Sequence, residues 1–193
     1  MFLREPRLGA VKRRLAHDIG ARAAWAFYRL TLRTVAWRLA RDPRWRLCLA
    51  VTPDRWPARD PGLPAGLRVV RQGAGDLGER MQRTLRALPT GPTLLVGSDI
   101  PDISAPLIWR AFERFKGHDA VFGPATDGGY WLVGLAPRPL AGKPFHGVNW
   151  SSPGALAETI GNLPAGTRLA MADTLPDIDN GEDYWRWLKD QRR

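Results

Sequence analysis

Apolar residues in the first fifth of the chain recur at spacings of three and four, which is typical of a helix with one buried face. The pattern runs from Lys12 to about Arg41, and it predicts a helix with a joint at Gly20 because glycine weakens a helix interior. The residue before a proline is driven out of the α region, so Asp42-Pro43 should end the helix. The expected buried face consists of Leu15, Ile19, Ala23, Phe27, Leu30 and Thr34.

Farther along the chain, short apolar runs alternate with helical patterns. The runs predict strands at 45–51, 67–71, 93–97, 119–123, 130–135 and near 168–171, and the helical patterns cover 76–88, 104–115, 153–161 and 179–191. Strand and helix in alternation, with one late hairpin, indicate an α/β domain with a mostly parallel sheet and helices on both faces. In such sheets ligands bind beyond the carboxyl ends of the strands. We expect the 193 residues to form one domain.

Composition adds a charge question to this picture. The net charge is +10, and nine of these charges are the surplus of Lys and Arg over Asp and Glu within residues 1–60. Such a surplus fits either a nucleic-acid-binding protein or a solvated basic helix face that keeps the protein soluble. The single cysteine excludes an intrachain disulfide. The chain has no apolar run of membrane-spanning length and no secretory leader pattern, which predicts a soluble, cytoplasmic protein.

A first candidate for chemistry is Asp99, which follows the most apolar strand in the sequence Ser98-Asp99-Ile100-Pro101. A carboxylate at such a strand end can hold a hard divalent cation, with phosphate oxygens in its remaining positions. The alternative is that Asp99 or Asp102 only caps the helix that begins near Ser104.

A second candidate is the segment Gly123-Pro124-Ala125-Thr126-Asp127-Gly128-Gly129-Tyr130. Two consecutive glycines allow the backbone to approach a ligand closely, with the Asp127 carboxylate beside them. The alternative is a plain Asp-Gly hairpin turn.

Two loop-to-helix transitions carry basic residues. Gly9 leads into a helix start with Lys12, Arg13 and Arg14, where free backbone N–H groups and cations make a phosphate cradle. The alternative is an ordinary basic first turn. Arg80, just after the Gly75 loop, is either a ligand contact or a surface charge.

The last polar cluster precedes the final helix. Asp179, with Glu182 three residues later, predicts a capping box, and a metal role for Asp179 stays open beside it. Most tryptophans are expected in the core, and Trp150 is the one expected near a ligand.

Taken in this order, the segments resemble a bacterial domain-of-unknown-function family of GT-A-type, glycosyltransferase-like proteins. Its relatives include 2-phospho-L-lactate guanylyltransferase and, more distantly, the molybdenum cofactor guanylyltransferases. The matching positions are Phe2, Pro6, Gly9, Val11, Lys12, Arg14, Leu15, 75–81, 97–101, 123–130, 150–151 and 177–179. The resemblance implies a three-layer α/β/α nucleotide-diphospho-sugar transferase fold with a Rossmann-like sheet.

The resemblance also implies roles for individual residues. Asp99 and Asp127 would be catalytic, Mg²⁺ or Mn²⁺ would be held by Asp99 and Asp179, and the remaining residues would bind substrates. Nucleotide binding is expected at Gly9, Lys12, Arg14, Arg80 and Ser98, and acceptor binding at Gly128, Gly129, Tyr130 and Trp150. The expected activity is metal-dependent glycosyl transfer from a nucleotide sugar to a small-molecule acceptor, by a protein that could act as a homodimer.

Three rival functions stay open at this stage. The first is nucleotidyl transfer from a nucleoside triphosphate to a phosphorylated acceptor. The others are nucleic-acid binding, ranked low because no nucleic-acid motif is present, and an inactive scaffold. The scaffold is suggested by departures from the family pattern: Arg4 and Arg13 replace a Lys and a Thr, and the chain begins near the end of the expected first strand. Either the start codon is misplaced, or this member has a reduced nucleotide pocket.

Overall fold

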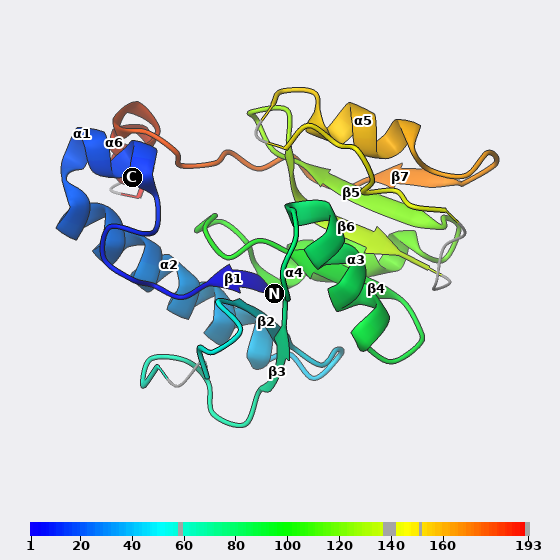
Figure 1. Ribbon diagram of the computed structural model, residues 1–193, viewed down its shortest axis with the longest axis horizontal. Helices are drawn as coiled ribbons and strands as arrows, with labels where there is room; N and C mark the ends of the chain where they lie inside the picture. The colour runs from blue at the N-terminus through cyan, green and yellow to red at the C-terminus, as the bar shows by residue number, and fades with distance from the viewer. Residues whose placement is uncertain (58–59, 137–141, 151, 192–193) are drawn as a thin grey trace.

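The computed structural model describes residues 1–57, 60–136, 142–150 and 152–191. Its strands are β1 (Phe2–Arg4), β2 (Cys48–Thr52), β3 (Arg68–Arg71), β4 (Thr93–Val96), β5 (Ala120–Pro124), β6 (Tyr130–Leu135) and β7 (Leu169–Met171). Its helices are α1 (Arg13–Ile19), α2 (Ala21–Ala40), α3 (Leu77–Ala87), α4 (Ala105–Arg114), α5 (Ala155–Gly161) and α6 (Gly181–Asp190). Strands and helices alternate along the chain as the sequence predicts (Figure 1).

The strands form two hydrogen-bonded sheets. One is fully parallel, in the order β1-β2-β3. The other has the order β4-β6-β5-β7, in which β6 is antiparallel to both neighbours and β7 is parallel to β5. The late hairpin of the sequence prediction is β5–β6. The α/β class is therefore confirmed, with one parallel and one mixed sheet where the sequence suggested one mostly parallel sheet.

Alternation along the strands buries the mixed sheet on both faces. Leu95, Phe122 and Val133 pack into a cluster with Met81 and Leu85 of α3. Their chain neighbours Val96, Val121 and Leu132 pack on the opposite side, in a larger cluster that also holds α2 and α4 residues. Because successive side chains of a strand point to opposite faces, this partition gives the three-layer α/β/α arrangement.

Tyr28 of α2 joins the two sheets at the point where no backbone ladder connects β1 to β4 in the described chain. Its buried hydroxyl accepts a hydrogen bond from the Arg4 N–H (3.1 Å) and donates to the Arg4 carbonyl (2.9 Å). The same oxygen lies 3.3 Å from Oγ of Ser98, just beyond β4. Burial raises the pKa of the Tyr28 phenol, so the hydroxyl keeps its proton. One side chain thus fixes the ends of both strands.

The predicted buried face of the first long helix is wrong in part. The helix is interrupted at Gly20, as expected. The interruption rotates the buried face of α2 relative to the predicted one, so Ala23 and Leu30 are exposed. The buried face of α2 consists of Ala24, Phe27, Tyr28, Thr31, Leu32, Val35, Ala36 and Leu39. The polar side chains of Tyr28 and Thr31 hid this face from a pattern based on apolar residues.

The first and last helices of the chain pack on each other. In Figure 1 the C-terminal α6 lies beside α1, far from the strands that precede it. Ile178, just before α6, is buried with Leu15 and Phe27. No described helix is both long and apolar enough to cross a membrane.

Candidate functional site

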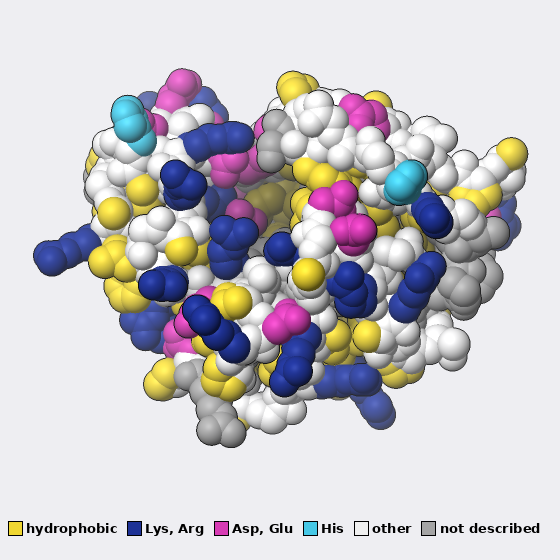
Figure 2. Space-filling model, viewed as in Figure 1, with side chains coloured by type: hydrophobic (Ala, Val, Ile, Leu, Met, Phe, Trp, Pro, Cys, Tyr) yellow, Lys and Arg dark blue, Asp and Glu magenta, His cyan; other side chains and the backbone are white. Residues whose placement is uncertain are grey.

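A cleft of about 540 Å³ lies at the carboxyl ends of the parallel strands. Figure 2 shows it as a hollow with acidic side chains in its wall and basic side chains along its rim. Segments following β1, β4 and β5 contribute Lys12, Asp99 and Asp127 to its lining. This is the position at which an α/β sheet binds ligands.

Asp127 enters the cleft from the turn between β5 and β6. Its Oδ1 accepts a hydrogen bond from the Gly129 N–H at 2.8 Å, which fixes the carboxylate over its own turn. Gly128 has a φ of +87°, and a Cβ at this position would lie 2.2 Å from the Pro153 carbonyl oxygen. Glycine is therefore required here both by conformation and by the close approach of another backbone segment.

Asp177 and Asp179 come from the extended segment between β7 and α6. This segment follows β5, since the Leu175 N–H donates to the Pro124 carbonyl at 3.1 Å and Leu175 forms a parallel bridge with Ala125. Ile178 between the two aspartates is buried, so both carboxylates face away from the core. The segment thereby brings Asp177 beside the Asp127 turn.

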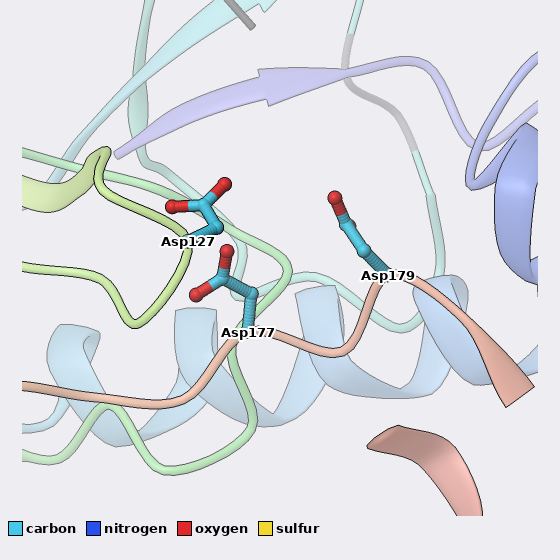
Figure 3. A group of neighbouring side chains, drawn as sticks. All are labelled: Asp127, Asp177 and Asp179. Carbon is cyan, nitrogen blue, oxygen red and sulfur yellow. The ribbon is translucent and has the colours of Figure 1, made fainter. Parts of the chain in front are cut away.

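Asp127, Asp177 and Asp179, which we call the acidic trio, are neighbours in the cleft; Figure 3 shows Asp127 and Asp177 next to each other and Asp179 to one side of them. One oxygen of each lies within 4.8 Å of the others, close enough to share a metal ion. Oδ1 of Asp177 is buried and has no hydrogen-bond partner among the described residues. Burial, and next the charge of Asp127, raise the pKa of Asp177 to about 7. The trio therefore holds more negative charge than its own surroundings neutralise.

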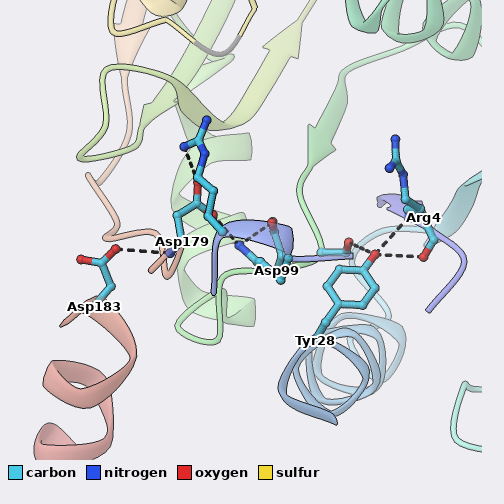
Figure 4. Close-up of polar contacts among 8 residues, drawn as sticks. Arg4, Tyr28, Asp99, Asp179 and Asp183 are labelled. Carbon is cyan, nitrogen blue, oxygen red and sulfur yellow. Dashed lines mark hydrogen bonds and ion pairs between the residues drawn. The ribbon is translucent and has the colours of Figure 1, made fainter. Parts of the chain in front are cut away.

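Lys12 neutralises the other carboxylate of the cleft. Its Nζ lies 2.8 Å from Oδ2 of Asp99 and 2.9 Å from Oδ1 of Asp179, and its side chain is only 6% exposed. Figure 4 shows Asp99 and Asp179 facing each other across this contact. Burial opposes the charge on Lys12, but the two carboxylates outweigh it and raise the pKa of the lysine. The Lys12 backbone is left-handed (φ 45°, ψ 52°), which is uncommon for a residue with a side chain.

Two further cations line the cleft without a carboxylate partner among the described residues. The Arg4 guanidinium donates only to the Ala10 carbonyl, at 3.4 Å, and Nε of Arg80 donates to the Gly75 carbonyl at 2.9 Å. Elsewhere some of the excess basic residues form ion pairs; Arg29 and Arg33, for example, both pair with Asp60. The unpaired charge in the cleft is therefore suited to a small anion.

Most of the residues that the sequence predicts for a site meet in this cleft. Those in its lining are Lys12, Arg80, Ser98, Asp99, Asp127, Gly129, Tyr130, Trp150 and Asp179. Gly9, Arg14 and Gly128 lie outside the lining: Gly9 and Gly128 shape turns, and Arg14 contacts Asp179 from the exposed side at 3.4 Å. Ser151 lies outside the described residues.

The predicted capping box at Asp179 and Glu182 is wrong. Asn180 caps α6 by accepting a hydrogen bond from the Asp183 N–H at 2.9 Å, so the helix begins one residue later than expected. The Asp179 side chain is thereby left to bind Lys12 and Arg14. A capping box does form at α3, where Asp76 is the N-cap and Glu79 completes the box.

Sequence reasoning assigned no site role to Asp177, Tyr28 or Gln72. Asp177 stands two positions before Asp179, and in an extended segment this spacing puts both side chains on one side. Gln72 is buried, and its Nε2 donates to the carbonyls of Leu3 (3.0 Å) and Ala50 (2.8 Å), which secures the strand ends under the cleft. Nothing in the local pattern marks Tyr28 or Gln72, because their partners are distant in sequence.

Fold and site together define an α/β protein with a charged ligand cleft at the ends of its strands. The chain belongs to the bacterial family described as "Uncharacterized protein conserved in bacteria (DUF2064)", whose model matches residues 31–152. The family resemblance drawn from the sequence is thus confirmed. No curated protein matches the chain.

Two solved structures are similar to this fold. One is a crystal structure of a "putative nucleotide-diphospho-sugar transferase" from Desulfovibrio desulfuricans G20, with 27% identity and a TM-score of 0.86. That alignment covers 100% of this chain and 86% of the other. The second is a homolog of Mycobacterium tuberculosis rv0371c from Mycobacterium sp. strain JC1, with 16% identity, a TM-score of 0.57 and coverage of 83% and 82%. The second likeness concerns the fold alone.

Proposed function

We propose that the protein is a metal-dependent glycosyltransferase that uses a nucleotide-sugar donor. The observation that carries this proposal is one cleft that combines three neighbouring carboxylates with a buried lysine and two arginines that have no carboxylate partner among the described residues. Such a site suits a divalent cation and a phosphate-bearing ligand together. The likeness to the Desulfovibrio protein, a "putative nucleotide-diphospho-sugar transferase", supports the same class of donor.

The residues of the trio fit Mg²⁺ or Mn²⁺. Carboxylate oxygens are the hard donors that these ions prefer, and the buried Oδ1 of Asp177 is an acceptor still without a partner among the described residues. Asp127, Asp177 and Asp179 would hold the ion. When bound, the ion would neutralise charge on the donor's phosphate oxygens. The metal role that the sequence gives to Asp99 stays a prediction beside this set.

The other residues of the cleft would position the two substrates. Lys12, Arg4, Arg80 and Ser98 would bind the nucleotide phosphates, and Asp99 would orient the Lys12 ammonium. Gly129, Tyr130 and Trp150 would form the acceptor side next to Asp127. Transfer of this type depends on positioning and charge neutralisation, and each of these groups is held by backbone or core contacts.

Nucleotidyl transfer from a nucleoside triphosphate is the second candidate. It is favoured by the number of cations along one cleft, since Arg4, Lys12 and Arg80 match a longer phosphate chain. The two reactions differ in their leaving groups. A glycosyltransferase releases a nucleoside diphosphate, whereas a nucleotidyltransferase releases pyrophosphate.

Calorimetry with Mn²⁺ tests the proposal and separates these donors. We expect a nucleotide sugar to bind only when Mn²⁺ is present, and Asp127→Asn to abolish this binding while the exposed Asp102→Asn does not. Stronger binding of a triphosphate, with pyrophosphate as product, would favour the second candidate. If no nucleotide binds with or without metal, both proposals fail. Binding to nucleic acid that exceeds that of an unrelated basic protein and falls steeply with salt would revive the nucleic-acid hypothesis.

A cytoplasmic location and a homodimer remain predictions for this enzyme. Light scattering in solution measures the assembly directly, and a monomer would remove the homodimer from the proposal.

A further inference from the structure

Lys12 holds together carboxylates from two distant parts of the chain. Asp99 follows β4, and Asp179 precedes α6, yet one ammonium group lies within 2.9 Å of both. The lysine is nearly enclosed, and its left-handed backbone shows that the surrounding contacts hold it in this place. An ammonium between two carboxylates occupies the kind of position that a metal ion could take.

Asp179 belongs to both charge systems of the cleft. Its Oδ1 contacts Lys12, and its Oδ2 lies 3.4 Å from Nη1 of Arg14. The same carboxylate is one of the three in the acidic trio. Both of its oxygens therefore already face a cation, and a metal ion bound to the trio has to compete with one of them.

The charges around the cleft indicate that a metal ion competing for Asp179 would release Lys12. Among the described residues, Asp99 and Asp179 contact Lys12 or Arg14, whereas Asp127 and Asp177 contact no cation. Arg4 and Arg80, the other cations of the lining, donate to backbone carbonyls. The two carboxylates without a cation in contact carry, when ionised, the charge that one divalent cation neutralises. Once that cation is present, the charge of Lys12 is no longer needed by Asp179 and can act on an anion in the cleft.

We propose that Lys12 couples metal binding to anion binding: it holds Asp179 in the metal-free protein and turns to a phosphate group when a divalent cation takes Asp179. This inference rests on the proposed function and adds that the divalent cation and the phosphate group bind cooperatively. Each ligand strengthens the other, because an effect of one binding event on another is reciprocal. Lys12 thus competes with the metal for Asp179 and, once displaced, contacts the phosphate.

The first test is the affinity of the protein for Mn²⁺ alone, measured from the free-ion signal in electron paramagnetic resonance. Lys12→Met removes the competing ammonium, so we expect Mn²⁺ to bind about fivefold more tightly than to the unaltered protein. Arg13→Met is the matched control. It removes the charge of the neighbouring residue, which is exposed and forms no ion pair with a carboxylate among the described residues. It should change the affinity for Mn²⁺ less than about twofold.

The second arm repeats these titrations in a fixed excess of inorganic phosphate. We expect phosphate to tighten Mn²⁺ binding by about fivefold or more in the unaltered protein and by less than twofold in Lys12→Met. Equal phosphate effects in both proteins would overturn the coupling. Equal or weaker Mn²⁺ binding by Lys12→Met, or the same gain in Arg13→Met, would overturn the competition.

Nuclear magnetic resonance of the lysine side chains provides a readout that needs no variant. The chain has four lysines, so the ammonium signal of Lys12 can be assigned readily. Saturating Mg²⁺ should shift this signal and leave those of Lys116, Lys143 and Lys189 in place; an unmoved Lys12 signal would overturn the inference. Failure of the unaltered protein to bind any metal, with or without phosphate, would instead remove the proposed function together with its coupling.

Discussion

Two acidic regions face each other in one cleft, and they are neutralised in different ways. Asp99 lies on the Lys12 ammonium at 2.8 Å, so its charge is already matched by the protein. The acidic trio has one contact to Lys12 and one to Arg14, both through Asp179. Asp127 and Asp177 have no ion pair among the described residues, and the pKa of Asp177 is raised to about 7.

This difference teaches where a cation belongs. An aspartate at the end of a central strand looks like a metal ligand by position, but a lysine can satisfy it from within the fold. Carboxylates that repel one another without a cation are the ones that gain most from binding one. We therefore expect the acidic trio, more than Asp99, to bind a cation.

The largest expected effect separates the two regions directly. Asp127→Asn should weaken Mn²⁺ binding about 100-fold, or about 2.7 kcal/mol, because a ligand oxygen and its charge are lost. Asp99→Asn should weaken it only about threefold, through the loss of long-range charge. Titration calorimetry measures both, with Asp102→Asn as the control. Equal losses at Asp99 and Asp127 would break the comparison and restore Asp99 as a ligand.

A second substitution disturbs only the turn that carries Asp127. Gly128→Ala should lower the free energy of unfolding by about 2 kcal/mol, because its Cβ would meet the Pro153 carbonyl and its φ of +87° is unfavourable. Urea denaturation gives the value. Gly166→Ala is a matched control, with a φ of +81° and open space around it, and should cost about 1 kcal/mol. Equal costs would show that the approach of Pro153 is not restrictive.

A third substitution disturbs only the Asp99 side. Tyr28→Phe should reduce the free energy of unfolding by about 1 kcal/mol, since it removes the hydroxyl that bonds the N–H and C=O of Arg4. Tyr184→Phe on α6 is the control. Chemical denaturation measures the loss, and Mn²⁺ binding by the trio should stay unchanged. A metal affinity that falls with Tyr28→Phe would mean that the two regions are not independent.

The smallest expected effect is a difference in how the stability of the protein depends on pH at Asp177 and at Asp119. The raised pKa of Asp177 means that the fold disfavours its charge, so the metal-free protein loses stability as the pH rises from about 3.8 to about 7. Asp177→Asn should therefore raise the melting temperature at pH 8 but not at pH 4. Thermal melts across this range provide the measurement.

Asp119 is the control for that experiment, because its pKa is shifted in the opposite direction. Hydrogen bonds from Arg168 hold the pKa of Asp119 at about 2, so its stabilising contribution is present above pH 3.8 and is lost as the pH falls toward 2. Asp119→Asn should lower the melting temperature at neutral pH and have little effect near pH 2. The same trend in both variants would contradict the distinction between paired and unpaired acids.

The sequence predicts the fold well because its signals are local. Alternating residues such as Val121 and Phe122, and the glycine break at Gly20, are visible in a short window. The division into two sheets is not visible, because it depends on which backbone edges meet across the molecule. Helix α2 shows most clearly where sequence prediction stops. Tyr28 has a polar hydroxyl and is not expected in the core, but it is buried there because the hydroxyl finds hydrogen-bond partners.

The candidate site is predicted less completely, for a related reason. Asp127 and Asp99 stand out because each follows a strand, and the predicted site residues Lys12 and Asp179 do meet in the cleft. That Lys12 bridges Asp99 and Asp179 could not be predicted, because the contact to Asp179 spans 167 positions and is made when α6 packs on α1. The choice between Asp99 and Asp177 as a ligand likewise depends on distances that no local pattern encodes.

The packing of α6 on α1 has a consequence for comparing members of the family. The family model matches residues 31–152, which contain Asp99 and Asp127 but not Lys12, Asp177 or Asp179. Four of the seven charged residues in the cleft lining thus come from the two flanking segments, which pack on each other outside the matched region: Arg4, Lys12, Asp177 and Asp179. A match to this model therefore does not test for Lys12, Asp177 and Asp179, and these positions have to be checked in the flanking segments of each relative.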